Sequence, residues 1–375
     1  MKIVLIPDKF KGSMTAEEVI RYLSKGIKRV DAKAEIHSVL ASDGGDGFLE
    51  AVSIHKNISW EESITVDPLG RSIKAPYLWD KDEMSAYIEL AKASGMELLK
   101  PSERNPLLTS TFGTGLQIKD AIAKGAKTIY LGLGGSATND GGIGIAMALG
   151  YVFTDVTGNE ILPIGANLLN IHGIEGKVKE PQLEEISFFA VNDVNNPLYG
   201  INGAAHVYAK QKGASELEIK NLDLGLRHLD KKVGELLGGN AASEAGSGAA
   251  GGTAYGLNVF FNAQFISGID FILDLAKVDM LLQQQKIDYI ITGEGKIDDQ
   301  TLNGKLIKGV IAKGKQFKVP VIGVCGKLDI NKESIRQLGM LDIVEIGDPT
   351  KSLQFNMENA TMLLEEASFN FFKEL

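Results

Sequence analysis

Strand-like and helix-like segments alternate at both ends of this chain, and this alternation constrains the fold more than any other feature. The apolar run at its start is typical of a strand buried on both faces. A helix pattern follows, in which Thr15 and Glu18 have the spacing of an N-terminal capping box. The elements expected in this part are strands at Lys2–Ile6 and Ile36–Leu40 and helices at Thr15–Val30 and from Gly47 to about His55.

The C-terminal part of the chain repeats this alternation. Strands that alternate with helices through short connections form a parallel sheet with helices packed on its faces. Both chain ends therefore predict parts of a parallel α/β sheet. The C-terminal elements are expected to be strands at Ile287–Thr292, Val319–Cys325 and Asp342–Ile346 and helices at Gly304–Gln316, Lys332–Leu338 and Met357–Glu374.

The middle of the chain has a different pattern. Alternating segments around turns such as Asp67–Gly70 favour antiparallel strands, expected at Ile64–Asp67, Ile73–Trp79 and Met84–Leu90. We therefore predict an α/β protein with a Rossmann-like, doubly wound parallel sheet built from both chain ends, residues 1–61 and 286–375, and an inserted second α/β domain at 62–285. Ligands bind such sheets beyond the carboxyl ends of the strands, and we expect the active site in the cleft between the domains.

Composition narrows the functional classes. Hydrophobic residues make up 44% of the chain and charged residues 23%, as in an ordinary globular protein. The net charge of −9 disfavours nucleic acid as a partner, and no run of about 18 apolar residues predicts a membrane span. The single cysteine, Cys325, excludes a disulfide framework and fits a reducing cytoplasm. We expect a cytoplasmic monomer or homodimer that acts on small molecules.

The segment Lys127–Gly150 is the strongest indication of a ligand site. A strand-like run at Ile129–Leu131 breaks into glycines, and a helix pattern of small residues follows through Ala146. A strand that ends in glycines before a helix can present backbone N–H groups to an anion, and glycine permits close approach. The alternative is a tight turn between packed elements. The candidates for cofactor binding are Gly134, Gly135, Ser136, Thr138, Asn139 and Asp140.

Three more charged, glycine-rich segments follow predicted strands: Pro7–Ser13, Ser42–Gly47 and Gly293–Asp298. Aspartate–glycine pairs are common in turns, which explains one such segment more readily than three. Because the carboxyl ends of parallel strands meet at one edge, we expect these segments to form a shared polar site. Its candidate side chains are Lys9, Lys11, Asp43, Asp46, Glu294 and Asp298, with Lys305 at the start of the next helix.

The segment Gly246–Gly251 matches the pattern G-x-G-x-x-G. The preceding stretch, Lys231–Ala245, predicts no strand, so the context of a dinucleotide-binding loop is missing. Ser247 and Gly248 remain candidates for cradling a phosphate. A Walker A loop is excluded, because no Gly-Lys pair is followed by Ser or Thr.

Other polar residues keep two interpretations each. Asp193 follows an apolar run and precedes an Asn-Pro turn, so it either caps the turn or binds Mg²⁺ or accepts a proton. Arg71 is either a solvated turn residue or a clamp for a carboxylate. Lys210 and Lys212 are expected to be solvated, although either could reach a phosphate.

A series of ordered motifs carries a resemblance over nearly the whole chain. The motifs are PDKFKGS at 7–13, SDGGDG at 42–47, DPLG at 67–70, FGTG at 112–115, GLGGSATNDGGIG at 132–144, NDVNNPLYG at 192–200, QKGA at 211–214, GSGAAGG at 246–252 and TGEGKIDDQTLNGK at 292–305. Together they resemble the bacterial glycerate kinase family of type I, the glycerate 2-kinase kind. The sequence departs from this family at Asn192, where the family often has cysteine, but it keeps Asp193.

The resemblance implies ATP- and Mg²⁺-dependent phosphorylation of D-glycerate, expected at the 2-hydroxyl, in a cytoplasmic enzyme. Phosphoryl transfer needs positioning and charge neutralisation more than covalent chemistry. Asp193, Lys9 and Lys11 are therefore expected to be catalytic, with Asp193 favoured as base, and Asp193 and Asp298 to bind Mg²⁺. The loops at 132–144 and 246–252, with Lys305, are expected to hold the ATP phosphates. Substrate binding is expected from Asp43, Asp46, Arg71, Glu294 and Asp298.

Two alternatives come from other functional classes. An NAD-dependent hydroxy-acid dehydrogenase would use Gly246–Gly251, and a non-catalytic regulator would only bind a sugar acid or nucleotide. An assay that separates ATP consumption from hydride transfer discriminates among the three.

Overall fold

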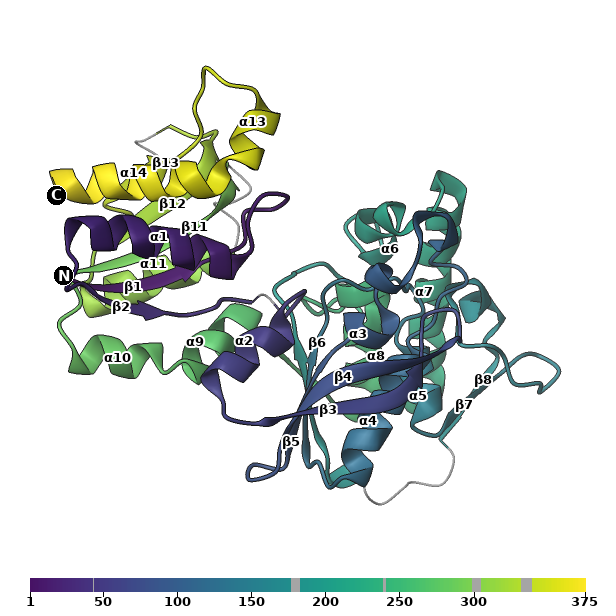
Figure 1. The fold of residues 1–375 in the computed structure, drawn as a ribbon. Coiled ribbons are helices and arrows are strands. Elements are labelled where there is room, and N and C mark those ends of the chain that lie inside the picture. The colour runs from purple at the N-terminus through teal and green to yellow at the C-terminus, as the bar shows by residue number, and fades with distance from the viewer. Residues whose placement is uncertain (43, 177–182, 239–240, 299–304, 332–338) are drawn as a thin grey trace. The chain divides into compact units, whose positions relative to one another are not determined.

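The computed structural model describes residues 1–42, 44–176, 183–238, 241–298, 305–331 and 339–375. The chain forms two compact units (Figure 1). The first unit combines Met1–Ser42 with Ile269–Leu375, and the second is the continuous stretch Asp43–Gly268. The first unit is thus built from both ends of the chain.

A parallel sheet forms the centre of the first unit. Its strands lie in the order β13-β12-β11-β1-β2, and each neighbouring pair is parallel. Ile3 pairs with Tyr289, so the two chain ends are neighbours in the sheet. This confirms the predicted parallel sheet from both chain ends. The strands are β1 (Lys2–Pro7), β2 (Glu35–Ser38), β11 (Tyr289–Ile297), β12 (Val321–Leu328) and β13 (Asp342–Glu345).

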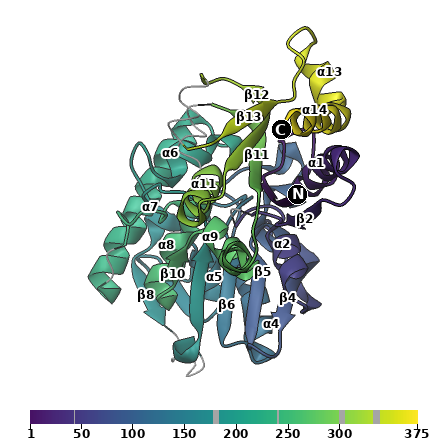
Figure 2. The ribbon, with the colours of Figure 1, turned by 90° about the vertical axis from the view of Figure 1, so that its left-hand side faces the viewer.

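Helices cover both faces of this sheet (Figures 1 and 2). Helices α1 and α14 pack against each other, and Leu23 and Leu364 share a buried cluster with Leu5 of β1. On the other face, α11 packs against β11 and β12. The helices of this unit are α1 (Ala16–Val30), α9 (Gly268–Leu275), α10 (Val278–Gln284), α11 (Lys305–Phe317), α13 (Leu353–Glu358) and α14 (Ala360–Glu374).

The start of α1 confirms the predicted capping box. The Glu18 amide donates to Thr15 Oγ1 at 3.2 Å, and the Thr15 amide donates to Glu18 Oε2 at 3.0 Å. The single helix expected at Met357–Glu374 is instead two helices, because the chain leaves helical geometry at Asn359. The helix expected at Lys332–Leu338 lies outside the described residues.

The second unit contains a mixed sheet in the order β10-β9-β6-β5-β4-β3. Strands β10, β9, β6 and β5 are parallel, whereas β5, β4 and β3 are antiparallel. The antiparallel strands predicted for the middle of the chain are therefore present. The strands are β3 (Ser59–Val66), β4 (Ser72–Asp80), β5 (Ser85–Glu89), β6 (Thr128–Gly132), β9 (Ser187–Val191) and β10 (Gln264–Ile266), with a separate pair, β7 (Tyr151–Thr154) and β8 (Gly173–Gly176).

The helices of the second unit pack in two groups. Residues of α4, α5 and α8 form one buried cluster with alternate residues of β5, β6 and β9, and α2 contacts β4 and β5. The helices are α2 (Phe48–His55), α3 (Ala91–Ser94), α4 (Phe112–Ala123), α5 (Ile143–Ala148), α6 (Ala204–Tyr208), α7 (Glu216–Leu237) and α8 (Ala249–Phe261), with 3₁₀ turns at Met96–Leu98, Pro101–Glu103, Gly165–Asn170, Leu183–Glu185 and Lys210–Lys212.

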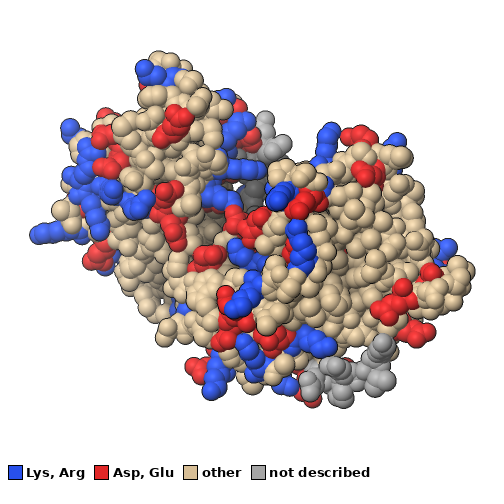
Figure 3. Space-filling view, turned by 45° about the vertical axis from the view of Figure 1, so that its right-hand side comes forward, with Lys and Arg blue, Asp and Glu red and all other residues tan. Residues whose placement is uncertain are grey.

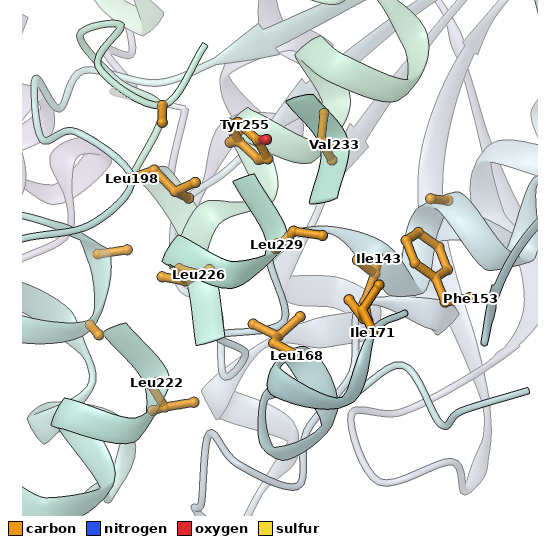
Figure 4. Close-up of a cluster of buried hydrophobic side chains, with 14 of the residues drawn as sticks. Ile143, Phe153, Leu168, Ile171, Leu198, Leu222, Leu226, Leu229, Val233 and Tyr255 are labelled. Carbon is orange, nitrogen blue, oxygen red and sulfur yellow. The ribbon is translucent and has the colours of Figure 1, made fainter. Parts of the chain in front are cut away.

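A second buried cluster of this unit centres on α7 (Figure 4). Leu226 and Leu229 of α7 pack with Ile143 at the start of α5 and with Tyr255 of α8. A Cβ built on Gly141 would lie 2.4 Å from Leu229 Cδ2. The core of the unit therefore presses directly against the glycine-rich segment that precedes α5.

The boundaries between the units differ from the expected positions after residues 61 and 285. Helix α2 contacts β4 and β5, so the residues from 43 onward belong to the second unit. Helix α10 contacts α11, and Ile269 lies against Gly309 of α11, so the residues from 269 onward belong to the first unit. Both boundaries are set by the packing of these helices. The pattern of strands in the sequence, on which the prediction relied, does not reveal this packing.

Within the described residues, no helix is both long and apolar enough to cross a membrane. On the face shown in Figure 3, basic side chains lie among acidic ones. Ion pairs between such side chains include Lys124 with Glu61, at 2.8 Å.

Candidate active site

The carboxyl ends of four parallel strands lie in one row in the second unit. Glu89 of β5 is in register with Gly132 of β6, Gly132 with Val191 of β9, and Val191 with Ile266 of β10. The glycine-rich segment after β6 and the Asn192–Asp193 segment after β9 therefore leave the same edge. The second unit thus has the strand-end arrangement at which ligands of parallel sheets bind.

The segment Gly44–Gly47 packs on this same edge. Gly134 N donates to Gly44 O at 3.0 Å, and a Cβ on Gly134 would lie 2.1 Å from Gly45 Cα. The absence of a side chain at Gly134 thus makes room for the protein's own backbone. Asp46 is exposed, and Asp43 lies outside the described residues.

Asp140 occupies the position that an anion was expected to take at the start of α5. It is fully buried and accepts hydrogen bonds from Thr111 N and Oγ1, both at 2.8 Å. The amides of Gly142 and Gly144 also donate to it, at 3.2 and 3.4 Å. Burial raises the pKa of Asp140, and these donors oppose the rise. In this structure the carboxylate itself satisfies the first amides of α5.

The two glycine-rich loops contact each other through their backbones. Gly141 N donates to Gly251 O at 3.1 Å, and a Cβ on Gly251 would lie 2.1 Å from Thr138 O. Gly251 adopts a left-handed φ of 66°, which favours glycine. The structure therefore brings the loops at 132–144 and 246–252 together.

The loop at 246–252 does not follow a strand. It comes after α7, so the structure confirms that a dinucleotide-binding context is missing. Ser247 is fully buried and donates to Ala241 O at 2.5 Å, and Gly248 N donates to Asn196 O at 2.9 Å. Both candidates thus make internal contacts that hold the loop.

Lys212 lies inside the loop region, whereas the sequence interpretation expected it to be solvated. Its side chain is only 3% exposed, and Nζ donates to Ser136 Oγ at 2.7 Å and to Thr138 O at 2.8 Å. Burial lowers the pKa of the Lys212 ammonium to about 7, although Asp140 opposes this change. The expectation that Lys212 is solvated is therefore wrong. The buried alanines at 205 and 209 have the helical spacing that could have placed residue 212 on the inner face.

The loop residues that Lys212 contacts are accompanied by polar atoms without hydrogen-bond partners in the residues that the structure describes. Asn139 Oδ1 and Nδ2 and Thr138 Oγ1 are buried and make no hydrogen bond within the described part of the chain. Buried polar groups without partners cost free energy. Gly135, by contrast, is exposed and has a left-handed φ of 71°. The loop therefore combines an exposed glycine with an unsatisfied polar interior, as expected for a site that awaits a polar ligand.

Asp193 lies just beyond β9 and is partly buried. Its Oδ1 accepts a hydrogen bond from Ser267 Oγ at 2.8 Å, and Ser267 directly follows β10. Residues after two neighbouring strands thus meet here. Asp193 therefore lies at the carboxyl edge of the sheet, as its position after an apolar run indicated.

Glu89 is a residue that the sequence interpretation missed. It ends β5 with no exposed surface and accepts a hydrogen bond from Leu49 N at 3.3 Å. Its Oε1 makes no hydrogen bond among the described residues and lies 3.4 Å from Lys92 Nζ. Burial raises the pKa of the Glu89 carboxyl to about 7, while Lys92 acts against the rise. An acidic residue at the end of a strand pattern indicates that it lies at the edge where the strands end. The sequence alone does not show that this residue is fully buried.

Arg71 is engaged by acids of the protein itself. Its Nε donates to Asp67 Oδ2 at 2.5 Å and Nη1 donates to Glu103 Oε1 at 2.8 Å. Asp67 also accepts from the Arg71 amide at 3.0 Å, which closes the turn. Arg71 thus clamps carboxylates, as one interpretation expected, but those of its own turn and of a neighbouring segment.

The remaining candidates lie in the first unit. Asp8 N donates to Gly293 O at 2.8 Å, and a Cβ on Gly295 would lie 3.2 Å from Lys11 N. The segment of Lys9 and Lys11, whose side chains are exposed, therefore lies against the segment after Gly293. Glu294 and Asp298 follow there, and Asp298 pairs with Lys296 at 3.0 Å. Lys305 begins α11, and its side chain lies outside the described part.

Comparison with known proteins identifies the family. The model of the Glycerate kinase family matches residues 3–375. The chain belongs to the glycerate kinase family. It is 39% identical over 370 residues to the glycerate kinase of Halalkalibacterium halodurans, covering 98% of this chain and 96% of that protein. It is 37% identical over 340 residues to the glycerate 2-kinase of Escherichia coli K12, covering 91% and 89%.

The fold is also similar to a solved structure of this family. A crystal structure from Salmonella typhimurium LT2, assigned as glycerate kinase 2, matches 100% of this chain and 98% of its own with a TM-score of 0.83 and 34% identity. The resemblance stated from the motifs is thereby confirmed, and the chain is a kinase. Neither alternative, a dehydrogenase or a non-catalytic regulator, fits this family.

Proposed function

We propose that this protein phosphorylates D-glycerate at its 2-hydroxyl with ATP and releases 2-phosphoglycerate and ADP. The observation that carries this proposal is the family match over residues 3–375. The name of the Escherichia coli relative, glycerate 2-kinase, supports the 2-hydroxyl as acceptor. We place the enzyme in the cytoplasm, since a single, buried cysteine fits a reducing compartment. We further propose that it is a monomer or homodimer that acts on small molecules.

In the proposed reaction the 2-hydroxyl oxygen attacks the γ-phosphorus of ATP. The new P–O bond forms as the bond to the ADP oxygen breaks, and Asp193 accepts the hydroxyl proton. Asp193 suits this role because it is partly exposed at a strand end and Ser267 holds one of its oxygens. Transfer depends chiefly on aligning donor and acceptor and on neutralising charge.

We assign the ATP phosphates to the loop Gly134–Asp140, with Lys305. The exposed Gly135 and the polar interior behind it support this assignment. Gly134, Asp140, Ser247 and Gly248 make internal contacts, so their proposed part in phosphate binding is to hold this loop in shape. Lys9, Lys11, Asp43, Asp46, Glu294 and Asp298 remain proposed substrate or catalytic contacts. Arg71 remains one too, but a substrate carboxylate would have to compete there with Asp67 and Glu103.

Mg²⁺ is the proposed metal, with Asp193 and Asp298 as its protein ligands. Both offer the carboxylate oxygens that Mg²⁺ prefers. Among the described residues no group of three or more His, Cys, Asp or Glu side chains could hold a metal, which suits an ion completed by water and phosphate oxygens. When bound, Mg²⁺ would neutralise charge on the phosphates.

Phosphorus NMR of the product made from D-glycerate tests the proposal in one experiment. We expect a 2-phosphoglycerate signal that requires both ATP and Mg²⁺, with ADP released in equal amount. A 3-phosphoglycerate signal would refute the 2-hydroxyl assignment. Background ADP formation across a panel of hydroxy acids would refute the glycerate kinase activity itself.

A further inference from the structure

Lys212 is held in place by its backbone as well as by its buried side chain. The Lys212 amide donates to Ala209 O at 3.1 Å. Gly213 follows with a left-handed φ of 101°, and a Cβ there would lie 2.1 Å from Arg104 O. The backbone therefore fixes the position at which the lysine side chain enters the loop interior. Its hydrogen bonds to Ser136 and Thr138 are a stable feature of the fold and do not come from a mobile surface side chain.

The charge of Lys212 is poorly compensated in this position. Asp140, from the segment before α5, is the acid that favours the ammonium form, but that carboxylate already accepts hydrogen bonds from Thr111, Gly142 and Gly144. The backbone of Arg104 packs on Gly213, the residue that follows Lys212. Burial lowers the pKa of Lys212 to about 7. An anion bound nearby would favour the charged ammonium and would therefore raise this pKa again.

We propose that Lys212 is a positioning residue, which orients the Ser136 hydroxyl toward a phosphate oxygen of the nucleotide and takes up a proton when that anion binds. This inference rests on the proposed function, in which the same loop holds the ATP phosphates. Ser136 is 5% exposed and directly follows the exposed Gly135, so it lies at the entrance of the polar interior.

The two protonation states of Lys212 orient Ser136 differently. A neutral amine has a lone pair and can accept the hydroxyl hydrogen of Ser136, which then points inward. A charged ammonium has only donors, so Ser136 Oγ must accept from it, and the hydroxyl hydrogen must point elsewhere. Binding of a phosphate favours the ammonium and thereby makes the serine hydroxyl a donor to the ligand.

Isothermal titration with a non-hydrolysable ATP analogue tests this coupling. Titrations at pH 8 in two buffers of different ionisation enthalpy report the protons taken up on binding. We expect the wild type to take up a substantial fraction of a proton, and Lys212→Met and Ser136→Ala to lose most of that uptake. Loss of a charged hydrogen bond should weaken nucleotide binding roughly 10- to 100-fold, with the KM for D-glycerate nearly unchanged.

Lys210→Met is the matched control. Lys210 lies in the same short turn, but its side chain is 77% exposed and pairs with Glu216 at 3.3 Å. This variant should keep both the affinity and the proton uptake of the wild type.

The outcomes separate this proposal from the proposed function. A wild type that neither binds the analogue nor phosphorylates D-glycerate overturns both. A wild type that does both without proton uptake, or a folded Lys212→Met with unchanged affinity and uptake, overturns the role of Lys212 alone. If Lys212→Met does not fold, the test becomes the comparison of the wild type with Ser136→Ala. A smaller proton uptake by Ser136→Ala supports the proposal, and equal proton uptake overturns it.

Discussion

Asp140 and Asp193 have contrasting environments, although both follow strands that end at the same sheet edge. Asp140 is fully buried, and four donors fix it at the start of α5. Asp193 is partly exposed and shares a hydrogen bond with Ser267. A carboxylate that satisfies helix amides cannot also move toward a substrate, whereas one at the surface can accept a proton. The local donors thus separate a structural acid from a candidate base.

Asp193→Asn should abolish most of the activity and leave the fold intact. The amide keeps the shape of the side chain but cannot accept the substrate proton, so turnover should fall by about 10²-fold or more. A coupled ADP assay and a thermal melt measure the two effects. Asp155→Asn is the control, because Asp155 caps an exposed turn through the amides of Thr157 and Asn159. Near-normal turnover of Asp193→Asn would leave Asp193 with the turn-capping role.

Glu89 should make the stability of the enzyme fall as the pH rises. Its folded pKa of about 7 lies above its ordinary value of 4.5, so the folded state holds the proton more tightly. The stabilisation is complete below pH 4.5 and is lost as the pH rises through 7. Melting curves from pH 5 to pH 8 should show the wild type losing stability relative to Glu89→Gln.

Glu97→Gln provides the comparison for Glu89, because Glu97 pairs with the same Lys92 but is 48% exposed. Its melting temperature should track that of the wild type over the same range. Parallel curves for the wild type and Glu89→Gln would contradict the predicted proton retention by Glu89.

The two glycine-rich loops act as one element, because each fills the space that side chains would occupy on the other. Gly251 packs on Thr138 and Asn139, and Gly256 packs on Gly141. The loop that carries the proposed phosphate contacts is therefore supported from α8 and not only by its own strand. Damage to the second loop should disturb ligand binding in the first.

Gly251→Ala tests this support. The new Cβ would meet Thr138 O at 2.1 Å, so the loops must separate, at a cost of about 1–3 kcal/mol beyond the left-handed backbone strain. Gly158→Ala is the control, because Gly158 has a similar φ of 82° but open space around its Cβ position. We expect a clearly larger drop in melting temperature for Gly251→Ala, together with weaker binding of an ATP analogue. An equal fall in melting temperature for both variants would show that the contact of Gly251 with Thr138 does not contribute to stability.

The sequence could predict the elements better than the contacts between loops. Strand β1 and helix α1 were predictable because apolar runs and a capping box are local signals. The role of Gly134 was not predictable. A glycine that lets a ligand approach cannot be distinguished in a sequence from one that lets the backbone of Gly45 approach. The burial of Lys212 was signalled only by the spacing of the alanines at 205 and 209, since the polarity of its neighbours predicted an exposed side chain.

At the scale of the whole molecule, the chain passes from the first unit to the second and back again. The family match spans both units, since it covers residues 3–375. Strand β1 is bonded to β2 and to β11, which both belong to the first unit. Its stability should therefore follow that of the C-terminal strands and not that of its nearer neighbours in sequence, such as β3.

Native-state hydrogen exchange in increasing denaturant should show this grouping. Amides of β1 and β11 should lose protection at the same denaturant concentration, because they share one sheet. Amides of β6, in the second unit, provide the reference for independent opening. Loss of protection in β1 together with β3 and before β11 would contradict the predicted cooperative unit.

The pairing of Ile3 with Tyr289 has a consequence for synthesis. At about 5–20 residues per second, the ribosome releases β11 roughly 15–60 s after β1. Asp43–Gly268 is a continuous stretch, so all of its strands are synthesised before β11. Strand β1 therefore waits for β11 before this pair can form, and the strands of the second unit are made in between.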